Sequence, residues 1–388
     1  MNDDNLGYDV AVGVPAALRA FQAPARLGFG DVIAPVMYTV DWRGGRWQRG
    51  SLLPYGPIQV LPGARGLQYA ELVFEGMKAY RVTPQAVPLQ AATPPAAAHT
   101  PLSQALRPAV ANLFRPHDNW QRLARSAARL SMPVVPEGLF FEAIDAVVGA
   151  CRDIIPSDSG RALYLRPFLF GTEAGYLLRN STTFSFMVIA NPVEIYAAGP
   201  MRVAIERRDV RAAVGGVGDA KAAANYAASL RASTAAVMRG MTVALWLDAR
   251  EQRYIQELSG MNVFAVIDGE LHTPALDGAI LPGVTRDSLL TLARHLGYTV
   301  IERPMLIDEL LDQVASGECS EVFACGTAAT VSPIGTLADD AGTGAGREYR
   351  PSRVDAVAAR LREALLAIQE RRAPDPFGWT RDVPAPAW

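Results

Sequence analysis

The chain has 388 residues, half of them hydrophobic, and a net charge of −2 at neutral pH. A chain of this length normally forms more than one domain, and we expect two. The near-neutral charge argues against a nucleic-acid partner, and no apolar run is long enough to span a bilayer, so no membrane partner is expected.

The small numbers of cysteines and histidines argue against disulfide bonds and metal sites. Cys151, Cys319 and Cys325 are widely spaced, which indicates reduced thiols in a cytoplasmic protein. The four histidines lack the spacing of metal ligands, so we expect no metal site. The opening residues, MNDDNLGYDV, are acidic and polar, and we expect no secretory signal there.

The first half of the chain mixes strand and helix patterns. A Gly44-Gly45 pair within residues 36–56 predicts a β-hairpin. Apolar spacing predicts helices over residues 122–132 and 139–155. Residues 161–170 and 182–193 are apolar and rich in Phe, Leu and Val, and they are expected to form strands.

The second half also alternates between the two patterns. We expect a helix from Lys221 toward Gly240, and a hairpin that turns at Asp268-Gly269. Thr285 follows a Pro-Gly turn and is predicted to cap a helix. Further predicted elements are a strand at 243–248, a strand at 298–305, a helix at 307–317, a strand-turn-strand at 321–335 and a helix at 354–372. The strands and helices follow no regular βαβ rhythm, which favours an α+β fold.

Two proline-containing stretches suggest how the chain is divided. Residues 84–108 hold six prolines, no glycine and no acidic residue, which indicates a solvent-exposed insertion, with a rigid lid as the alternative. The stretch ANPVEIYAAGP resembles a linker. The predicted division is a smaller N-terminal domain at 1–190, a linker at 191–200 and a larger C-terminal domain at 201–388.

One lysine stands among very small side chains, in the segment GGVGDAKAAANYAAS. The chain has only two lysines, Lys78 and Lys221, which leaves 37 − 2 = 35 arginines to carry the other basic charges. Arginine cannot lose its proton in a protein and cannot act as an amine nucleophile, whereas lysine can. We interpret Lys221 as a candidate Schiff-base lysine; the ordinary alternative is a solvated lysine at a helix start. Lys78 is interpreted as structural.

A phosphate-bearing aldehyde cofactor would need more than this lysine. The segment PGVTRDS places backbone amides and the Thr285 hydroxyl at a helix start, where anions bind well. The segment CGTAAT offers a second tight turn with Thr327. Glu257 supplies a carboxylate at a strand edge, which could face a pyridine nitrogen and keep it protonated; alone, it could equally be a solvated loop acid.

Eight segments follow one another over most of the chain from about Phe29. They are YAELVFEGMKAYR, LFRPHDNWQRLARSAARLSMP, LYLRPFLFGTEA, GGVGDAKAAANYAAS, ELSGMNVF, LPGVTRDSLL, VFACGTAATVSPIG and IQERRAPDPFGW. Together, and in this order, they resemble the branched-chain amino acid aminotransferases, and the resemblance is specific because the segments occur together. It implies the two-domain pyridoxal-phosphate fold type shared with D-amino acid aminotransferases and aminodeoxychorismate lyase.

The resemblance also implies residue roles, with pyridoxal 5′-phosphate as cofactor. Lys221 would bind the cofactor aldehyde and move the substrate proton, Glu257 would pair with the ring nitrogen, and Tyr226 would bond the phenolic oxygen. The phosphate would be held by Arg122, Val284, Thr285 and Thr327. The substrate would be bound by Phe29, Tyr69, Phe74, Tyr164 and Arg166, with its α-carboxylate at Thr327 and Ala328. Tyr176 and Leu178 would lie on a loop that reaches the partner's pocket, which implies a homodimer.

Some positions depart from the family pattern. Ala223-Ala224 replace the usual Gly-Gly, Val217 replaces a threonine, and the CxxC pair of mammalian relatives is absent. The proline-rich stretch lengthens a normally short hairpin loop. None of these changes removes a catalytic group. The expected activity is reversible transamination of leucine, isoleucine or valine with 2-oxoglutarate. The alternatives are another activity of the same fold, D-amino acid transamination or aminodeoxychorismate lysis, and a non-catalytic binding homologue.

Overall fold

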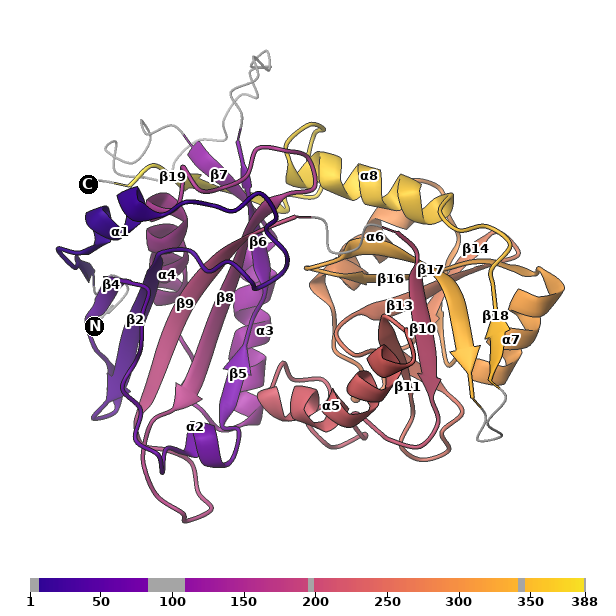
Figure 1. Ribbon diagram of the computed structural model, residues 1–388, viewed down its shortest axis with the longest axis horizontal. Helices are drawn as coiled ribbons and strands as arrows, with labels where there is room; N and C mark the ends of the chain where they lie inside the picture. Colours follow the sequence, from indigo (N-terminus) through magenta and orange to yellow (C-terminus); the bar gives the residue numbers. More distant parts are fainter. Residues whose placement is uncertain (1–6, 83–108, 195–198, 341–345, 387–388) are drawn as a thin grey trace, which may run out of the picture.

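The computed structural model describes residues 7–82, 109–194, 199–340 and 346–386. Two large sheets, each with its own helices, form two lobes (Figure 1). Strands and helices are intermixed in the chain, and the sheets are mostly antiparallel with a few parallel pairs. The predicted α+β fold is confirmed.

The first sheet has ten strands in the order β1-β4-β2-β9-β8-β6-β7-β19, with β3 beside β2 and β5 beside β8. Its strands are β1 (Tyr8–Val10), β2 (Val36–Arg43), β3 (Arg46–Trp47), β4 (Gly50–Pro54), β5 (Leu72–Phe74), β6 (Met77–Arg81), β7 (Ala109–Phe114), β8 (Ala162–Gly171), β9 (Phe184–Val193) and β19 (Thr380–Pro384). The accompanying helices are α1 (Val14–Ala20), α2 (Arg65–Gln68), α3 (Pro116–Arg129) and α4 (Glu137–Ala150).

The second sheet has nine strands in the order β12-β11-β10-β17-β16-β13-β14-β15, with β18 beside β17. Its strands are β10 (Met201–Glu206), β11 (Val243–Leu247), β12 (Ile255–Leu258), β13 (Asn262–Ile267), β14 (Glu270–Pro274), β15 (Val300–Arg303), β16 (Cys319–Gly326), β17 (Thr330–Asp339) and β18 (Arg347–Tyr349). The helices are α5 (Ala223–Met238), α6 (Val284–His295), α7 (Ile307–Ser316) and α8 (Val357–Gln369).

The local sequence explains where several helices and strands begin or end. The β2–β3 hairpin turns at Gly44 and Gly45, which both have positive φ, as the tight hairpin turn requires. Helix α7 ends at Gly317 with φ +88°, a left-handed C-terminal position that suits glycine. Helix α6 corrects one expectation: its N-cap is Gly283, so Thr285 lies inside the first turn and does not cap the helix.

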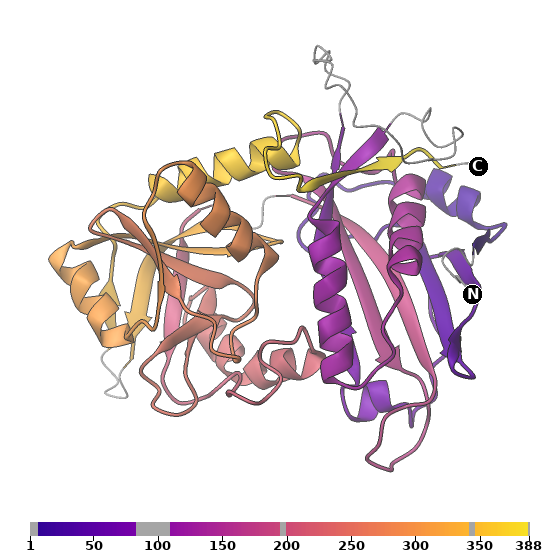
Figure 2. The ribbon, with the colours of Figure 1, turned by 180° about the vertical axis from the view of Figure 1, so that it is seen from behind.

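The two lobes share a hydrophobic core as well as having their own. Tyr80, Phe114 and Tyr164 from the first sheet belong to the same buried cluster as Phe264 and Phe323 from the second. Helices α5 and α8 each contact strands of both sheets, and Figure 2 shows them bridging the lobes below and above. The lobes are therefore joined by shared packing as well as by the chain itself.

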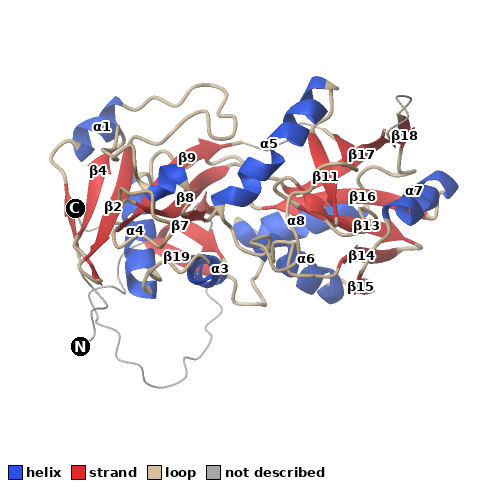
Figure 3. Cartoon of the chain, turned by 90° about the horizontal axis from the view of Figure 1, so that it is seen from below, coloured by secondary structure: helices blue, strands red, loops and turns tan. Residues whose placement is uncertain are grey.

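The proposed division into domains remains a prediction. Residues 191–193 belong to β9, and part of the expected linker lies outside the described residues. The last strand, β19, pairs with β7 of the first sheet, so the end of the chain returns to the N-terminal lobe. The proline-rich insertion, residues 84–108, also lies outside the described residues. Figure 3 shows the two lobes from below, with α5 between them.

Candidate active site

A cavity of about 680 Å³ lies between the lobes and is lined by residues of both sheets. Most of the predicted site residues line it, although they come from distant parts of the sequence. These are Phe29, Phe74, Arg122, Tyr164, Arg166, Lys221, Tyr226, Glu257, Val284, Thr285, Thr327 and Ala328. The cavity therefore brings together the residues that the sequence motifs indicated.

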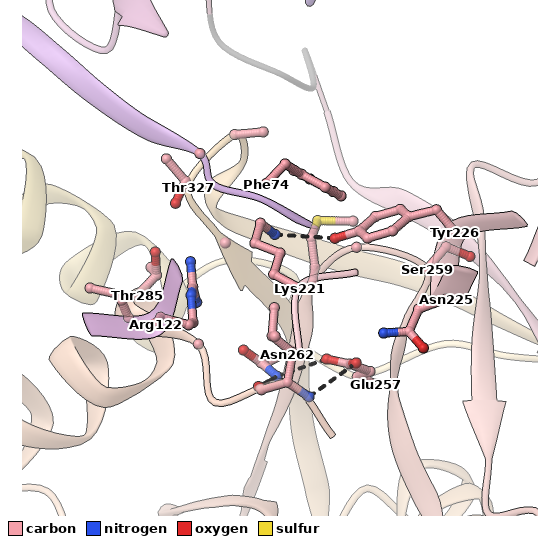
Figure 4. A pocket seen from close by; sticks show the side chains of 18 of the residues that line it. Phe74, Arg122, Lys221, Asn225, Tyr226, Glu257, Ser259, Asn262, Thr285 and Thr327 are labelled. Atoms are coloured by element: carbon pink, nitrogen blue, oxygen red, sulfur yellow. Dashed lines mark hydrogen bonds between the residues drawn. The ribbon is translucent and has the colours of Figure 1, made fainter. Parts of the chain in front are cut away.

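Lys221 is fixed by backbone contacts immediately before α5 begins. Its amide donates to the Ser126 hydroxyl over 2.9 Å, and its carbonyl accepts from the Phe74 amide over 3.0 Å. Its Nζ lies 3.1 Å from the Tyr226 hydroxyl and 4.9 Å from the centre of the Phe74 ring (Figure 4). The amine thus points into the cavity, beside a phenol, and no carboxylate among the described residues lies within salt-bridge distance of it. A solvated helix-start lysine does not match this position.

Glu257 lies on β12, an edge strand of the second sheet, and is only 3 % exposed. The alternative of a solvated loop acid is therefore wrong. The carboxylate accepts hydrogen bonds from Asn262 Nδ2 at 3.0 Å and from the Leu281 amide at 3.2 Å. Its Oε1 also lies 2.6 Å from Arg211 Nη2. Burial raises the pKa of Glu257 to about 7, and the charge of Arg211 opposes that shift.

Another part of the cavity is suited to an anion. Arg122 lies on the buried face of α3, and α6 begins beside it at Gly283. Figure 4 shows Arg122, Thr285 and Thr327 on one side of Lys221, with Tyr226 on the other. The free amides of a helix N-terminus and a guanidinium together favour a phosphate-like group.

Glu75 holds Arg122 in place, a contact that sequence reasoning missed. The Arg122 Nε and Nη2 atoms donate to the two Glu75 oxygens at 2.7 and 2.9 Å, and Asn119 Nδ2 donates to Oε2 at 2.8 Å. Burial by itself would raise the pKa of Glu75, but the Arg122 guanidinium, together with Lys221 and Asn119, holds it below its usual range. Glu75 belongs to the quoted motif FEGMKAYR, yet nothing in the motif tells which charge it meets.

The turn between β16 and β17 presents the Thr327-Ala328 backbone to the cavity. Among the described residues, the amides of Thr327 and Ala328 donate to no protein acceptor. Behind the turn, Lys78 Nζ donates to the Ala328 carbonyl at 3.0 Å. Burial lowers the pKa of Lys78 to about 8. Lys78 supports the turn from behind, in keeping with its structural interpretation, and the turn's free amides could receive a carboxylate.

One end of the cavity is lined by aromatic rings and by a single cationic side chain. Phe29 meets the Tyr164 ring edge-on, with centroids 4.9 Å apart. The Arg166 guanidinium lies over the Phe74 ring, 4.7 Å from its centroid, and its Nη2 donates to the Tyr164 hydroxyl at 3.3 Å. Its buried Nε has no protein partner. An apolar wall with one incompletely paired arginine can accept either an aliphatic group or a carboxylate.

Three predicted residues lie away from this cavity lining. Tyr69 is 44 % exposed, and its hydroxyl donates to the Tyr176 carbonyl at 2.8 Å. Tyr176 and Leu178 are 77 % and 91 % exposed on the loop between β8 and β9. Within the single chain, Tyr69 therefore contacts the loop rather than the cavity.

The described residues hold no group of three or more His, Cys, Asp or Glu side chains placed to bind a metal ion. In the same part of the chain, no helix is both long enough and apolar enough to cross a membrane.

Comparison with known proteins shows the family of the chain. Residues 107–337 match the family Amino-transferase class IV. The branched-chain-amino-acid transaminase 1 of Bacillus subtilis is 38% identical over 93% of this chain and 95% of its own. A probable branched-chain-amino-acid aminotransferase of Streptomyces coelicolor is 40% identical over 92% of each chain. The branched-chain amino acid aminotransferase of Escherichia coli has a solved structure with a TM-score of 0.65 at 25% identity, over 89% of this chain and 98% of its own.

A second solved branched-chain amino acid aminotransferase carries a ligand that bears on the cavity. It is complexed with N-(5′-phosphopyridoxyl)-L-glutamate and has a TM-score of 0.65 at 27% identity, over 89% of this chain and 98% of its own. That ligand joins a phosphopyridoxyl group to glutamate, so the related protein holds both in one complex.

Because the family match spans more than half of the chain, this chain belongs to the class IV aminotransferases. Within it, the chain is a member of the branched-chain amino acid aminotransferases. The resemblance stated on the sequence motifs is thereby confirmed, together with the fold type that it implied.

Proposed function

We propose that this chain is a pyridoxal 5′-phosphate-dependent enzyme that moves an amino group reversibly between leucine, isoleucine or valine and 2-oxoglutarate. The observation that carries the proposal is the Lys221 amine, which faces the cavity 3.1 Å from the Tyr226 hydroxyl. When bound, the cofactor supplies an aldehyde for the amino group and a ring that takes up electrons from the substrate Cα. Family membership supports both the cofactor and the activity.

The residues present fit such a cofactor. Lys221 would bind the aldehyde and would carry the proton that leaves the substrate Cα. Tyr226 lies next to it and would bond the phenolic oxygen. Buried Glu257 would face the ring nitrogen. Two buried guanidinium nitrogens in the lining, Arg166 Nε and Arg211 Nε, have no protein partner, which is typical of a cavity wall that awaits a polar ligand.

The phosphate would be held at the anion side of the cavity. Arg122, pinned by Glu75, and the amides at the start of α6 provide one cation and several donors. Val284 and Thr285 lie in the first turn of that helix, and Thr327 lines the same cavity. Together they would orient the cofactor so that its aldehyde reaches Lys221.

The two substrates differ in charge, and the aromatic pocket can serve both. A branched aliphatic side chain would pack on Phe29, Phe74 and Tyr164, and the side-chain carboxylate of glutamate would meet Arg166. The α-carboxylate of either substrate would accept from the Thr327 and Ala328 amides. One methylene in an apolar pocket changes discrimination by only about 1–3 kcal/mol, so the pocket suits leucine, isoleucine and valine alike.

We also propose a homodimer in which Tyr176 and Leu178 reach the partner's pocket and Tyr69 acts through that loop, in a cytoplasmic protein. The hydrogen bond from Tyr69 to the loop and the exposure of the loop's apolar side chains support this arrangement. The sedimentation velocity of the purified protein tests it: a monomer at micromolar concentration would contradict the dimer.

The enzymatic proposal is tested by the absorption spectrum and a substrate panel. The purified protein, incubated with pyridoxal 5′-phosphate, should show a visible band that borohydride abolishes. Leucine, isoleucine and valine should each yield the matching 2-oxo acid and glutamate when 2-oxoglutarate is present. A protein without the band is the non-catalytic homologue. D-amino acids as the preferred donors, or turnover of aminodeoxychorismate, would favour another activity of the fold.

A further inference from the structure

Arg211 is a charged residue of the cavity wall that none of the predicted roles uses. It lies between β10 and α5 and is only 8 % exposed. An arginine almost never sits this deep without a paired charge, because removing a guanidinium from water is costly. Its surroundings therefore indicate what it does.

The Arg211 guanidinium is committed to one carboxylate. Its Nη2 lies 2.6 Å from Glu257 Oε1 and also donates to the Ala279 carbonyl. Glu257 is the only acid that pairs with it among the described residues. Its Nε is buried without a protein partner. Arg211 is therefore a fixed positive charge set directly against Glu257.

Glu257 needs that charge because its position disfavours ionisation. The carboxyl is buried, and burial favours its neutral form. Besides Arg211, the charged groups that act on it are Lys221 and Arg122, which lie farther away and whose side chains contact Tyr226 and Glu75. The amide of Leu281 and the Asn262 side chain donate to it but carry no charge.

A buried carboxyl beside a pyridine nitrogen can share one proton in two ways. Either the carboxylate faces a protonated ring nitrogen, or the neutral acid donates to an unprotonated one. The two arrangements contain the same atoms, so the surrounding charges decide between them. A cation in contact with the carboxylate stabilises the first arrangement, in which the ring can take up electrons.

We infer that Arg211 is a positioning residue that holds Glu257 ionised, so that the ring nitrogen of the bound cofactor keeps its proton. The inference rests on the proposed function, since it requires pyridoxal 5′-phosphate in this cavity. It adds to that function a residue that acts through Glu257 without reaching the reacting atoms.

The test reads the protonation of the ring nitrogen directly. The apoprotein is loaded with pyridoxal 5′-phosphate carrying ¹⁵N in the ring, and the nitrogen resonance is recorded for the wild type, Arg211→Met and Arg211→Gln. The wild type should show a protonated ring nitrogen. In both variants the resonance should move toward that of an unprotonated pyridine. Arg211→Gln keeps hydrogen-bonding capacity without charge, so it separates the charge from the contact and serves if Arg211→Met does not fold.

A binding measurement supplies a second readout without turnover. Wild-type apoprotein should prefer pyridoxal 5′-phosphate over its 1-deaza analogue, in which carbon replaces the ring nitrogen. Arg211→Gln should reduce that preference by about tenfold, the order expected when one charge-assisted contact is lost. Arg231→Met is the matched control, because the Arg231 side chain is 83% exposed and pairs with Asp209 rather than with Glu257; it should change neither readout.

Two results would overturn the inference. One is a wild-type nitrogen resonance in an Arg211→Gln protein that binds the cofactor. The other is an equal loss of affinity for both cofactor forms, which would make Arg211 merely structural. Failure of the proposed function looks different: the wild-type protein itself would then form no borohydride-sensitive band.

Discussion

Glu257 and Lys221 owe their proposed roles to the atoms that surround them. A glutamate in a loop is normally solvated, but Glu257 on β12 is buried. It accepts two hydrogen bonds and forms an ion pair with an arginine. A lysine at a helix start normally extends into water, but here both backbone groups of Lys221 are bonded and its amine meets a phenol. At this scale the chemistry depends on burial and on the nearest partner.

Replacing Lys221 by arginine should keep the positive charge and abolish turnover. A guanidinium stays protonated, so it can neither bind the aldehyde covalently nor accept the substrate proton. Borohydride treatment followed by mass spectrometry should find cofactor attached to the wild type and none attached to the variant. Wild-type transamination by Lys221→Arg would refute the assignment.

Replacing Glu257 by glutamine tests the electron-sink role. Glutamine has nearly the same shape and can still hydrogen-bond, but it cannot balance a pyridinium charge. Cofactor binding should persist through the phosphate contacts and Lys221, while proton abstraction slows sharply. The half-reaction with leucine deuterated at Cα measures this step, and its isotope effect should grow or appear. An unchanged half-reaction rate would rule out the proposed contact with the ring.

At the scale of elements, an ion pair and a close approach fix two helices around the cavity. Helix α3 is tied to the β5–β6 turn by the Arg122–Glu75 pair. Helix α6 begins against β13, where Gly283 faces the Asn262 side chain. Small changes at these junctions should therefore alter cofactor binding.

Glu75→Gln should lower the free energy of unfolding and weaken cofactor binding. Breaking one partner of a buried ion pair leaves the other charge uncompensated, at a cost of about 3–5 kcal/mol. The pKa of Glu75 is below its usual range in the folded state. Ionised Glu75 therefore stabilises the folded protein at any pH above its pKa in the unfolded chain. This stabilisation is lost as the pH falls through its pKa in the folded protein. Urea unfolding of wild type and variant should differ most near neutral pH and converge in acid; a pH-independent difference would contradict this account.

Gly283→Ala should weaken cofactor binding at the phosphate end. An added Cβ would lie 2.1 Å from Asn262 Oδ1 and 3.3 Å from the Arg286 Cβ. Asn262 would have to move, although it donates to Glu257 at 3.0 Å. We expect at least about a tenfold rise in the dissociation constant of pyridoxal 5′-phosphate, measured by fluorescence titration of the apoprotein. Gly56→Ala, where a Cβ meets nothing within 4 Å, is the control, and equal affinities for the two variants would contradict the steric argument.

For the molecule as a whole, the two lobes are joined by more than one chain crossing. Helices α5 and α8 contact both sheets, one hydrophobic cluster contains residues of both, and β19 returns to the first sheet. Arg381 anchors that last strand on α4 through an ion pair with Asp145. Its two Nη atoms each lie 2.7 Å from a carboxylate oxygen of Asp145. The cavity between the lobes thus has walls whose separation is set by shared packing.

Deleting residues 85–107 and closing the gap with a short turn should leave activity within about threefold of the wild type. The flanking strands β6 and β7 are antiparallel neighbours, paired at Tyr80↔Asn112 and Arg81↔Ala111, so a tight turn can join them. Loop length by itself changes stability only slowly. Steady-state kinetics with leucine measure the outcome, and a large rise in the Michaelis constant would make the segment a working lid.

The sequence by itself determined the elements and most of the residues of the candidate site. Hairpins at Gly44-Gly45 and Asp268-Gly269, and helices with apolar periodicity, depend on neighbours a few residues apart, so local pattern predicted them. The rarity of lysine singled out Lys221, and the family motifs indicated the residues around it. The contacts of Glu75 with Arg122 and of Arg211 with Glu257 were decided only by the tertiary structure. So were the burial of Glu257, the position of Tyr69 outside the cavity and the return of β19. These contacts depend on segments far apart in the chain. Residue type and spacing alone do not indicate which charges folding brings into contact.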